Sequence, residues 1–335
     1  MIIISEKLSA LIVGGSPGER DVFMRSVEVF SDQENCQIPN IEIIPIYVSF
    51  YPTLINNNDE IRLCGRGEDS ILHECYALQN GTCYNDDYEY DYENGEEQDS
   101  TYSCLEWRDR GELNNRVGDK GTRVITMPNG VYLFGPDFLE WLPTGQATWK
   151  RLKPNYASQF EGGCLVQTSA HEILMLGGLG TFRDIVKYDT QTHKYETMPQ
   201  KLQQGRYRHS CIKFEDTIII TGGENHNGHD LSSTELLNIQ DLTSITEPYM
   251  DMEETRVGHG LVIVHYDNEP KVLAIGGEYK FYGDYIGDIT RKTRDTVEIW
   301  DPASKTWTLD QDLKLSESRA NFGFVSVPTH LLCSP

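Results

Sequence analysis

The stretch Cys211-Ile-Lys-Phe-Glu-Asp-Thr-Ile-Ile-Ile-Thr-Gly-Gly223 decides the fold of this 335-residue chain. It contains an apolar run, a polar turn, a second apolar run and a pair of glycines. Two apolar runs around a polar turn are typical of a β-hairpin. A glycine pair at the end of a strand can adopt positive φ and lets the backbone approach a neighbouring sheet closely. The stretch therefore predicts two antiparallel strands that end at a close contact with another sheet.

The same pattern occurs in two further segments, Cys164–Gly178 and Leu261–Gly277. Successive glycine pairs are 45 and 54 residues apart. A second predicted hairpin follows each pair, and in Ile185–Tyr195 and Val297–Trp307 aromatic residues stand three and ten positions after the first apolar residue. The chain therefore contains a repeat of four short strands, in which the late aromatics supply packing area between units.

Three weaker copies extend the repeat in both directions. Ala10–Gly15 is followed by Val27–Phe30, while Cys64-Gly65 and Phe134-Gly135 take the place of the glycine pair in the second and third copies. The first copy lacks its first strand, and Arg319–Val327 near the other end of the chain matches such a strand. We therefore expect six units, with the C-terminal strand completing the N-terminal unit and closing a ring without open edges.

The three clear units resemble the kelch repeat, which has a period of about 50 residues. The resemblance implies an all-β, six-bladed kelch β-propeller that forms a single domain over residues 1–335. The expected blades are residues 8–40 with 318–328, 50–113, 116–154, 158–199, 205–250 and 255–315. An open β-sandwich is the alternative, but it leaves the circular permutation of the repeat unexplained.

Charge and hydropathy narrow the function. With 52 Asp and Glu against 29 Lys and Arg, the formal net charge is −23, which repels nucleic acids and anionic bilayers. No apolar run approaches the roughly 20 residues of a membrane-spanning helix. We expect no nucleic-acid partner and no membrane insertion, and the sequence does not indicate an oligomeric state. No export signal is visible, so we expect either an intracellular protein or a mature or truncated form.

The ligand sets of two catalytic kelch-type propellers are missing from the sequence. A resemblance to galactose oxidase would require a cysteine-linked tyrosine and histidine copper ligands. Specifier proteins that act on thiohydroximates carry iron ligands in the spacing Glu-x-x-x-Asp-x-x-x-His. Here the pairs Glu28/Asp32 and Glu247/Asp251 are followed by Cys36 and Thr255 instead of histidine. We therefore predict no catalytic residues, no cofactor and a non-enzymatic protein.

The loop Gly222–Asp230 contains Glu224, His226, His229 and Asp230, which are residue types that ligate zinc. The loop is also rich in glycine and asparagine, as variable polar loops of propellers are. We expect a solvated contact loop and no metal, with His226, His229 and Asp230 as weak candidates for ligands.

Three arginines recur four residues before the small residue that opens a predicted first strand. Equivalent positions of successive blades lie on one face around the central channel, and the loops after the glycine pairs open onto that face. Arginines and aromatics on supported loops favour binding of a protein or peptide, and the arginines suit a partner that is acidic. The expected ligand-binding residues are Arg206, Arg208, His209, Arg256, His259, Arg319, Tyr279 and Tyr282. An equally weighted alternative is that the recurring arginines pair with neighbouring carboxylates as part of the repeat.

Residues 79–106 form an expected acidic, tyrosine-rich insertion in the second blade. Eight acidic residues, five tyrosines and no Lys or Arg lie between Tyr84 and Ser103, a composition that does not fold on its own. A bond between Cys83 and Cys104 would staple the base of this insertion.

We also expect a bond between Cys64 and Cys75, which would join the second and third strands of this blade. This pair resembles the Cys-Gly-Gly…Cys blades of extracellular invertebrate kelch proteins, to which the chain is most similar. Cys164 and Cys211 occupy equivalent first-strand positions in adjacent blades and are expected to be reduced core residues. Cys36 and Cys333 have no assigned pairing.

Two signs favour an extracellular, secreted glycoprotein over the cytoplasmic alternative. Asn80-Gly81-Thr82 is an N-glycosylation sequon, and tyrosines flanked by acids are typical sulfation sites. The leading functional hypothesis is a protein- or peptide-binding scaffold. The alternatives are a carbohydrate-active propeller similar to sialic-acid mutarotases, a lectin-like propeller, and the substrate-recognition part of a ubiquitin-ligase adaptor.

Overall fold

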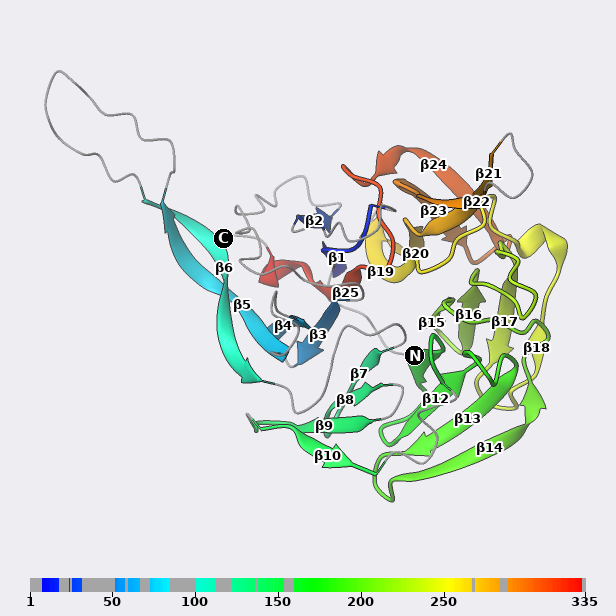
Figure 1. The fold of residues 1–335 in the computed structure, drawn as a ribbon, viewed down its shortest axis with the longest axis horizontal. Helices are drawn as coiled ribbons and strands as arrows, with labels where there is room; N and C mark the ends of the chain where they lie inside the picture. The colour runs from blue at the N-terminus through cyan, green and yellow to red at the C-terminus, as the bar shows by residue number, and fades with distance from the viewer. Residues whose placement is uncertain are drawn as a thin grey trace, which may run out of the picture.

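The computed structural model describes residues 8–17, 24, 26–31, 52–57, 60–66, 73–84, 101–112, 122–135, 138–146, 148–153, 160–266, 269–283 and 289–332. Their strands form six antiparallel sheets around a common centre, which is the architecture of a six-bladed β-propeller (Figure 1). The all-β prediction is confirmed. None of the helices in these residues is long and apolar enough to cross a membrane.

In each four-stranded blade the strands follow one another in chain order from the centre of the ring to its outer edge (Figure 1). Blade 1 contains β25 (Gly323–Pro328), β1 (Leu8–Val13) and β2 (Val27–Phe30). Blade 2 contains β3 (Thr53–Asn57), β4 (Glu60–Arg66), β5 (His73–Tyr84) and β6 (Thr101–Glu112). Blade 3 contains β7 (Arg123–Met127), β8 (Gly130–Phe134), β9 (Leu139–Pro143) and β10 (Lys150–Leu152).

The remaining blades follow the same order. Blade 4 contains β11 (Cys164–Gln167), β12 (Glu172–Leu176), β13 (Asp184–Asp189) and β14 (Lys194–Lys201). Blade 5 contains β15 (Ser210–Phe214), β16 (Thr217–Thr221), β17 (Thr234–Asn238) and β18 (Ser244–Ile245). Blade 6 contains β19 (Gly260–Tyr266), β20 (Glu269–Ile275), β23 (Thr296–Asp301) and β24 (Thr306–Lys314). A separate hairpin of β21 (Glu278–Tyr282) and β22 (Ile289–Thr293) lies between β20 and β23 in the chain.

The ring closes through its first and last described strands. β25 pairs antiparallel with β1, from Leu8 opposite Pro328 to Val13 opposite Gly323. The prediction that the C-terminal strand completes the N-terminal blade is therefore confirmed.

The core of the described part consists of six apolar clusters, each between two adjacent blades. The run Ile218-Ile219-Ile220 shows why the strands are so apolar. Ile218 and Ile220 pack in the cluster with blade 4, whereas Ile219 packs in the cluster with blade 6. Because side chains alternate across a strand, a central strand that is buried on both faces needs a continuous apolar run.

The glycine pairs have the predicted conformation. Gly177 and Gly178 have φ values of 61° and 107°, and Gly222 and Gly223 have 62° and 89°. A Cβ atom on Gly177 would lie 2.7 Å from the carbonyl oxygen of Arg206, which belongs to the next blade. These glycines therefore permit the close contact between blades that the sequence predicts.

In the two weakest copies the register differs by one residue from the expectation. Cys64 pairs with Thr53, and Phe134 pairs with Arg123, in the way that Thr221 pairs with Ser210. Cys64 and Phe134 therefore precede the glycine position instead of occupying it.

The late aromatics pack against one another on the third and fourth strands. The ring centroids of Trp300 and Trp307 are 5.2 Å apart, and those of Tyr188 and Tyr195 are 4.7 Å apart. Trp307 Nε1 also donates a hydrogen bond to Thr234 Oγ1 of blade 5 at 3.0 Å. The aromatics thus supply the packing between blades that their spacing predicts.

Candidate functional site

One face of the propeller gathers the segments before the inner strands and those after the glycine pairs. Isolated antiparallel bridges join these segments in three blades: Ser16 with Ala320, Tyr207 with Glu224, and Val257 with Glu278. We call this the loop face.

Backbone hydrogen bonds connect successive blades around the channel mouth on the loop face. The N–H of Arg208 donates to Gly162 O at 2.6 Å, the N–H of Gly258 donates to Arg208 O at 2.9 Å, and the N–H of Asn321 donates to Gly258 O at 2.9 Å. This belt of four residues fixes the relative positions of blades 4, 5, 6 and 1 by main-chain atoms.

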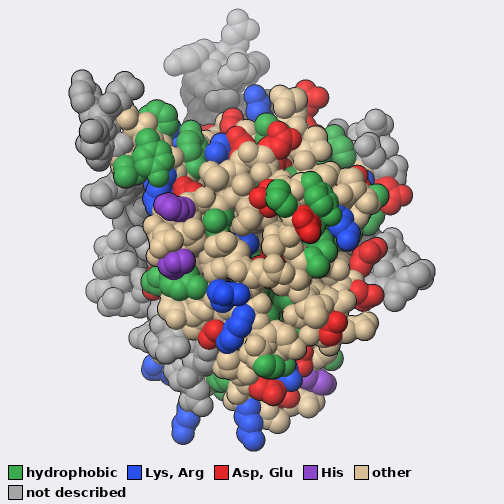
Figure 2. All heavy atoms as spheres, turned by 90° about the vertical axis from the view of Figure 1, so that its right-hand side faces the viewer, with side chains coloured by type: hydrophobic (Ala, Val, Ile, Leu, Met, Phe, Trp, Pro, Cys, Tyr) green, Lys and Arg blue, Asp and Glu red, His purple; other side chains and the backbone are tan. Residues whose placement is uncertain are grey.

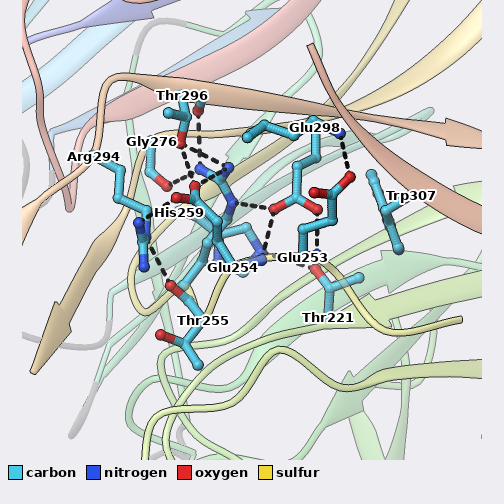
Figure 3. Close-up of polar contacts among 12 residues, drawn as sticks. Thr221, Glu253, Glu254, Thr255, His259, Gly276, Arg294, Thr296, Glu298 and Trp307 are labelled. Carbon is cyan, nitrogen blue, oxygen red and sulfur yellow. Dashed lines mark hydrogen bonds and ion pairs between the residues drawn. The ribbon is translucent and has the colours of Figure 1, made fainter. Parts of the chain in front are cut away.

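The recurring arginines lie beneath this mouth and are not surface groups. Arg206, Arg256 and Arg319 are each 0% exposed. Arg256 Nη1 donates to Gly276 O at 2.7 Å and to Thr296 O at 2.9 Å, and Arg256 Nε donates to Glu298 Oε1 at 3.0 Å. Figure 3 shows Glu298, Thr296 and Gly276 grouped around these contacts. The guanidinium is therefore committed to acceptors inside blade 6.

Arg206 and Arg319 make the equivalent contacts in their own blades. Arg206 Nη1 donates to Gly222 O at 2.8 Å, and Arg319 Nη1 donates to Gly14 O at 3.2 Å. Arg319 also pairs with Glu28. Burial lowers the pKa of Arg206 to about 10. The expectation that these three arginines offer a surface for a ligand is therefore wrong, because all three are buried. Arg256 and Arg319 pair with carboxylates, as the alternative predicts. The contacts described for Arg206 go to Gly222 and Ser233 instead.

His209 and His259 are also buried, each 2% exposed. His259 Nε2 lies 2.8 Å from Thr221 Oγ1, and the two atoms share a hydrogen bond. Leu176 takes the place of Thr221 in blade 4, so the His209 ring meets no hydroxyl there and approaches the backbone of Leu176 instead. Burial lowers the pKa of both histidines, that of His259 to about 3, so both rings are neutral at pH 7.

Of the predicted ligand-binding arginines, Arg208 is the one that reaches the loop face. Its Nη2 lies 2.6 Å from Glu278 Oε1 and 3.1 Å from Asn321 Oδ1, so its side chain crosses the channel mouth over Gly258. Arg291 Nη1 also approaches Glu278 Oε1, at 3.2 Å.

The loop Gly222–Asp230 holds charged partners of the β21–β22 hairpin. The Glu224 carboxylate pairs with Lys280 and Arg291, and the Asp230 carboxylate lies 3.5 Å from Arg291 Nη2. His226 and His229 are exposed. In the part of the chain that the structure describes, no three His, Cys, Asp or Glu side chains are placed to hold a metal ion.

The β21–β22 hairpin carries three exposed apolar side chains. Phe281 is 40% exposed, Tyr282 65% and Ile289 54%. Lys292 is exposed, and its Nζ lies 3.4 Å from the centroid of the Phe281 ring. Figure 2 shows a hydrophobic patch at the upper left with blue Lys and Arg beside it. Tyr279 lies lower on the hairpin, where Arg294 stacks on its ring at 4.0 Å.

The sequence-based prediction named Tyr279 and Tyr282 of this hairpin but not Phe281, Ile289 and Lys292. It assigned the whole segment after Gly277 to a loop, because the four-strand repeat leaves no place for two further strands. The β-prone run Tyr279–Tyr282 followed by a glycine was the available signal.

A cavity of about 480 Å³ occupies the central channel below the mouth. Its walls come mainly from the inner strands and the residues just before them, including Thr122, Arg123, His209 and His259. This position on the ring axis is one of the usual places for small ligands in propellers and barrels.

Two disulfides are described. The predicted bond between Cys64 and Cys75 is present, with the Cα atoms 4.2 Å apart on paired positions of β4 and β5. Cys164 and Cys211 also form a bond, with the Cα atoms 6.0 Å apart, so the expectation of reduced thiols is wrong. The two cysteines are not at equivalent positions, because Cys164 pairs with the residue before the glycine pair of its blade, as Ser210 does, and Cys211 lies one position further along. The inner strands of neighbouring blades come close together beside the channel, which brings the two cysteines within bonding range.

Other expected covalent features lie partly outside the described residues. Cys104 takes part in a disulfide, but the side chain of Cys83 lies outside the described part, as do Cys36 and Cys333. The acidic stretch 85–100 lies outside it as well. Asn80 is exposed on β5, a position that is open to modification.

The fold and this face define a six-bladed β-propeller with a loop-face hairpin and a central cavity. No family model and no curated protein matches the chain. Among solved structures it is similar to YjhT, with a TM-score of 0.61 and 12% sequence identity over 84% of this chain and 88% of that chain. At this identity the likeness shows the propeller fold alone.

Proposed function

We propose that this chain is a non-enzymatic binding module that holds a protein or peptide partner on its loop face, with the β21–β22 hairpin as the anchor. One observation carries the proposal. Of six exposed large hydrophobic side chains in the described part, three belong to this hairpin, namely Phe281, Tyr282 and Ile289, and Tyr282 pairs with Ile289. Single exposed apolar residues are ordinary, whereas a cluster of them on one element is typical of an interaction site.

The base of the hairpin is fixed while its exposed side chains are left for contact. The N–H of Lys280 donates to Asp230 Oδ2 at 2.6 Å, and Arg291 pairs with Glu224 and Glu278. An apolar anchor on a rigid support loses little conformational entropy on binding, which favours affinity. The network of charges therefore supports the hairpin as a preorganised anchor.

Charge beside the patch favours a partner segment that combines apolar side chains with a carboxylate. Lys292 is exposed next to Phe281, on a chain whose net charge is −23. A local cation attracts an acidic group to this point, whereas the negative charge on the rest of the molecule repels that group. The two described disulfides are compatible with an extracellular protein, so we propose that the partner is met outside the cell.

The test compares two variants of the full chain. In the first, Phe281, Tyr282 and Ile289 are changed to serine; in the control, exposed Ile245 and Tyr249 near the outer strand of blade 5 are changed to serine. We expect proteins captured from native extract, quantified by mass spectrometry, to fall at least tenfold with the first variant only. Both variants should keep the native melting temperature. Equal capture by the hairpin variant and the native chain would falsify the proposal.

A sugar ligand is the alternative that the same variants separate. The native chain, the hairpin variant and a His226→Ala/His229→Ala variant are applied to a glycan array. We expect no glycan to be retained by any of them. Glycan binding that survives in the hairpin variant and is lost in the histidine variant would replace the proposed partner with a carbohydrate.

A further inference from the structure

The two edges of the β21–β22 hairpin differ in their main-chain contacts. On the β21 side, Glu278 exchanges two main-chain hydrogen bonds with Val257, at 2.8 and 2.9 Å. The N–H of Lys280 on the same edge donates to Asp230 Oδ2 at 2.6 Å. The β21 edge is therefore occupied, and a further strand finds room only along β22.

The pairing geometry determines which main-chain groups of β22 point to this second edge. In an antiparallel pair, two opposite residues either bond to each other or both turn their N–H and C=O groups outward. Glu278 and Lys280 turn theirs away from β22, so their opposite residues Thr293 and Arg291 do the same on the other side. Ile289, two positions from Arg291, follows the same alternation. Within the described part of the chain, the main chain of Ile289 and Arg291 has no hydrogen bond at this edge.

The outer edges of the blades differ from the edge of β22. The long outer strands β6, β14 and β24 each pair with a shift in register, and the outer strands β10 and β18 have only three and two residues. Irregular pairing and short length are means by which proteins protect strand edges from further pairing. β22 pairs with β21 over all five of its residues without a shift. Its edge therefore has the regular geometry that an added strand requires.

Two different side chains lie beside the free edge, one on each face of the hairpin. Lys292 shares a face with Phe281, because its Nζ lies 3.4 Å from the centroid of that ring. Ile289 lies on the opposite face, where it pairs with Tyr282. Lys292 and Ile289 are both exposed. Since side chains alternate along a strand, an added strand would present one set of side chains to the lysine and the other set to the isoleucine.

The charge of this edge indicates which kind of strand it accepts. The β22 edge of a second copy would bring Arg291 and Lys292 of both copies close together, and like charges on neighbouring strands are destabilising. An extended segment that alternates carboxylate and apolar side chains complements both faces, with a carboxylate beside Lys292 and an apolar group beside Ile289.

We infer that the partner of the hairpin binds as an added antiparallel β-strand along β22, with carboxylates beside Lys292 and apolar side chains beside Ile289. The main-chain groups of Ile289 and Arg291 supply hydrogen bonds, and the alternation supplies specificity. This inference rests on the proposed function, since it specifies how the hairpin holds its partner.

The test measures binding of the fluorescein-labelled peptide Val-Glu-Val-Glu-Val to the full chain by fluorescence anisotropy. With its glutamates beside Lys292, the peptide turns the amides of its valines toward β22 and those of its glutamates away. N-methylation of the valine amides removes the hydrogen bonds to β22, and we expect it to weaken binding by about tenfold or more. N-methylation of the glutamate amides is the matched control and should leave binding unchanged.

Two variants of the chain test the charge at the edge. Lys292→Glu places a carboxylate beside those of the peptide, and we expect it to weaken binding by about tenfold or more. Lys194→Glu makes the same exchange at an exposed position of the outer strand β14. It should bind the peptide as the native chain does, and both variants should keep the native melting temperature.

The outcomes separate this inference from the proposed function. The inference is overturned if the peptide does not bind, if the two methylated peptides bind equally well, or if the glutamate-methylated peptide binds more weakly. If capture from native extract still depends on Phe281, Tyr282 and Ile289 in those cases, the hairpin holds a partner in another way. Capture that does not depend on these side chains contradicts the proposed function itself.

Discussion

Arg256 and Glu298 of blade 6 form an ion pair in which both side chains are 0% exposed. In blade 4 two apolar residues occupy the equivalent positions. Phe160 stands at the position of Arg256, and Val186 stands at the position of Glu298. Phe160 and Val186 belong to the same apolar cluster. A buried ion pair and an apolar pair thus fill the same site in different blades, which agrees with the small net stability of buried ion pairs.

The two sites of the pair should therefore be strongly coupled. Arg256→Phe alone leaves Glu298 buried without its cation, and we expect it to lower the free energy of unfolding by about 3–5 kcal/mol. Adding Glu298→Val, as in blade 4, should recover about 2 kcal/mol of that loss. Urea unfolding of the native chain, both single variants and the double variant measures the coupling. Simple additivity of the two single effects would contradict this view.

At this scale the sequence indicated which residues recur but not how deep they lie. The spacing of Arg206, Arg256 and Arg319 correctly placed them at equivalent positions. Whether an arginine side chain is exposed or buried depends on the hydrogen-bond acceptors around it, such as Gly276 O and Thr296 O for Arg256. These acceptors become neighbours of the arginine only in the folded blade.

The two described disulfides act on different elements. The bond between Cys64 and Cys75 joins two strands inside blade 2, with 11 residues of sequence separation. The bond between Cys164 and Cys211 joins the inner strands β11 and β15 of neighbouring blades, with a separation of 47 residues. A cross-link that closes a longer loop removes more conformational entropy from the unfolded chain.

We expect the bond between blades to contribute more to stability. Changing Cys164 and Cys211 to alanine should lower the free energy of unfolding by about 4 kcal/mol, and changing Cys64 and Cys75 by about 3 kcal/mol. Denaturant midpoints of the two variants under non-reducing conditions measure this order. If the first variant is as stable as the native chain, Cys164 and Cys211 do not form the bond in solution.

Element prediction succeeded where burial on both faces forced an apolar run, as in Ile218–Ile220. It failed at β21–β22, which form a separate two-stranded sheet joined to the segment before β19 by the bridge of Glu278 with Val257. Their side chains alternate between charged partners such as Arg291 and exposed apolar groups such as Phe281, so no repeat position identifies them.

The whole ring was predictable because its repeat is circularly permuted in the sequence. The first repeat lacks its inner strand, and the last predicted strand has no further strands after it to form a repeat. Both facts are explained if the last strand completes the first blade and closes the ring. The closing strand β25 covers β1, whose residues Ala10 to Val13 are all 0% exposed. The central cavity was not predictable, since its walls come from blades far apart in the sequence.

Removing the closing strand should open the ring. A chain that ends at residue 316 exposes the edge of β1, and we expect it to aggregate and to lose its cooperative thermal transition. A synthetic peptide of residues 317–335 added during refolding should restore a monomer with a single transition, measured by light scattering and calorimetry. A truncated chain that stays monomeric with the native transition would show that closure is dispensable.

The belt at the channel mouth allows different side chains at the opening of the ring, because main-chain atoms alone form it. Gly162, Arg208, Gly258 and Asn321 are chemically unlike, yet all have φ between 52° and 69° and all join the same chain of main-chain hydrogen bonds. The frame therefore demands a backbone conformation and not a particular side chain. Glycine leaves the aperture wide, while Arg208 reaches across to Asn321 and narrows it. An engineer could exchange these residues, with glycine and asparagine as the least strained choices, and adjust what enters the channel without rebuilding the blades.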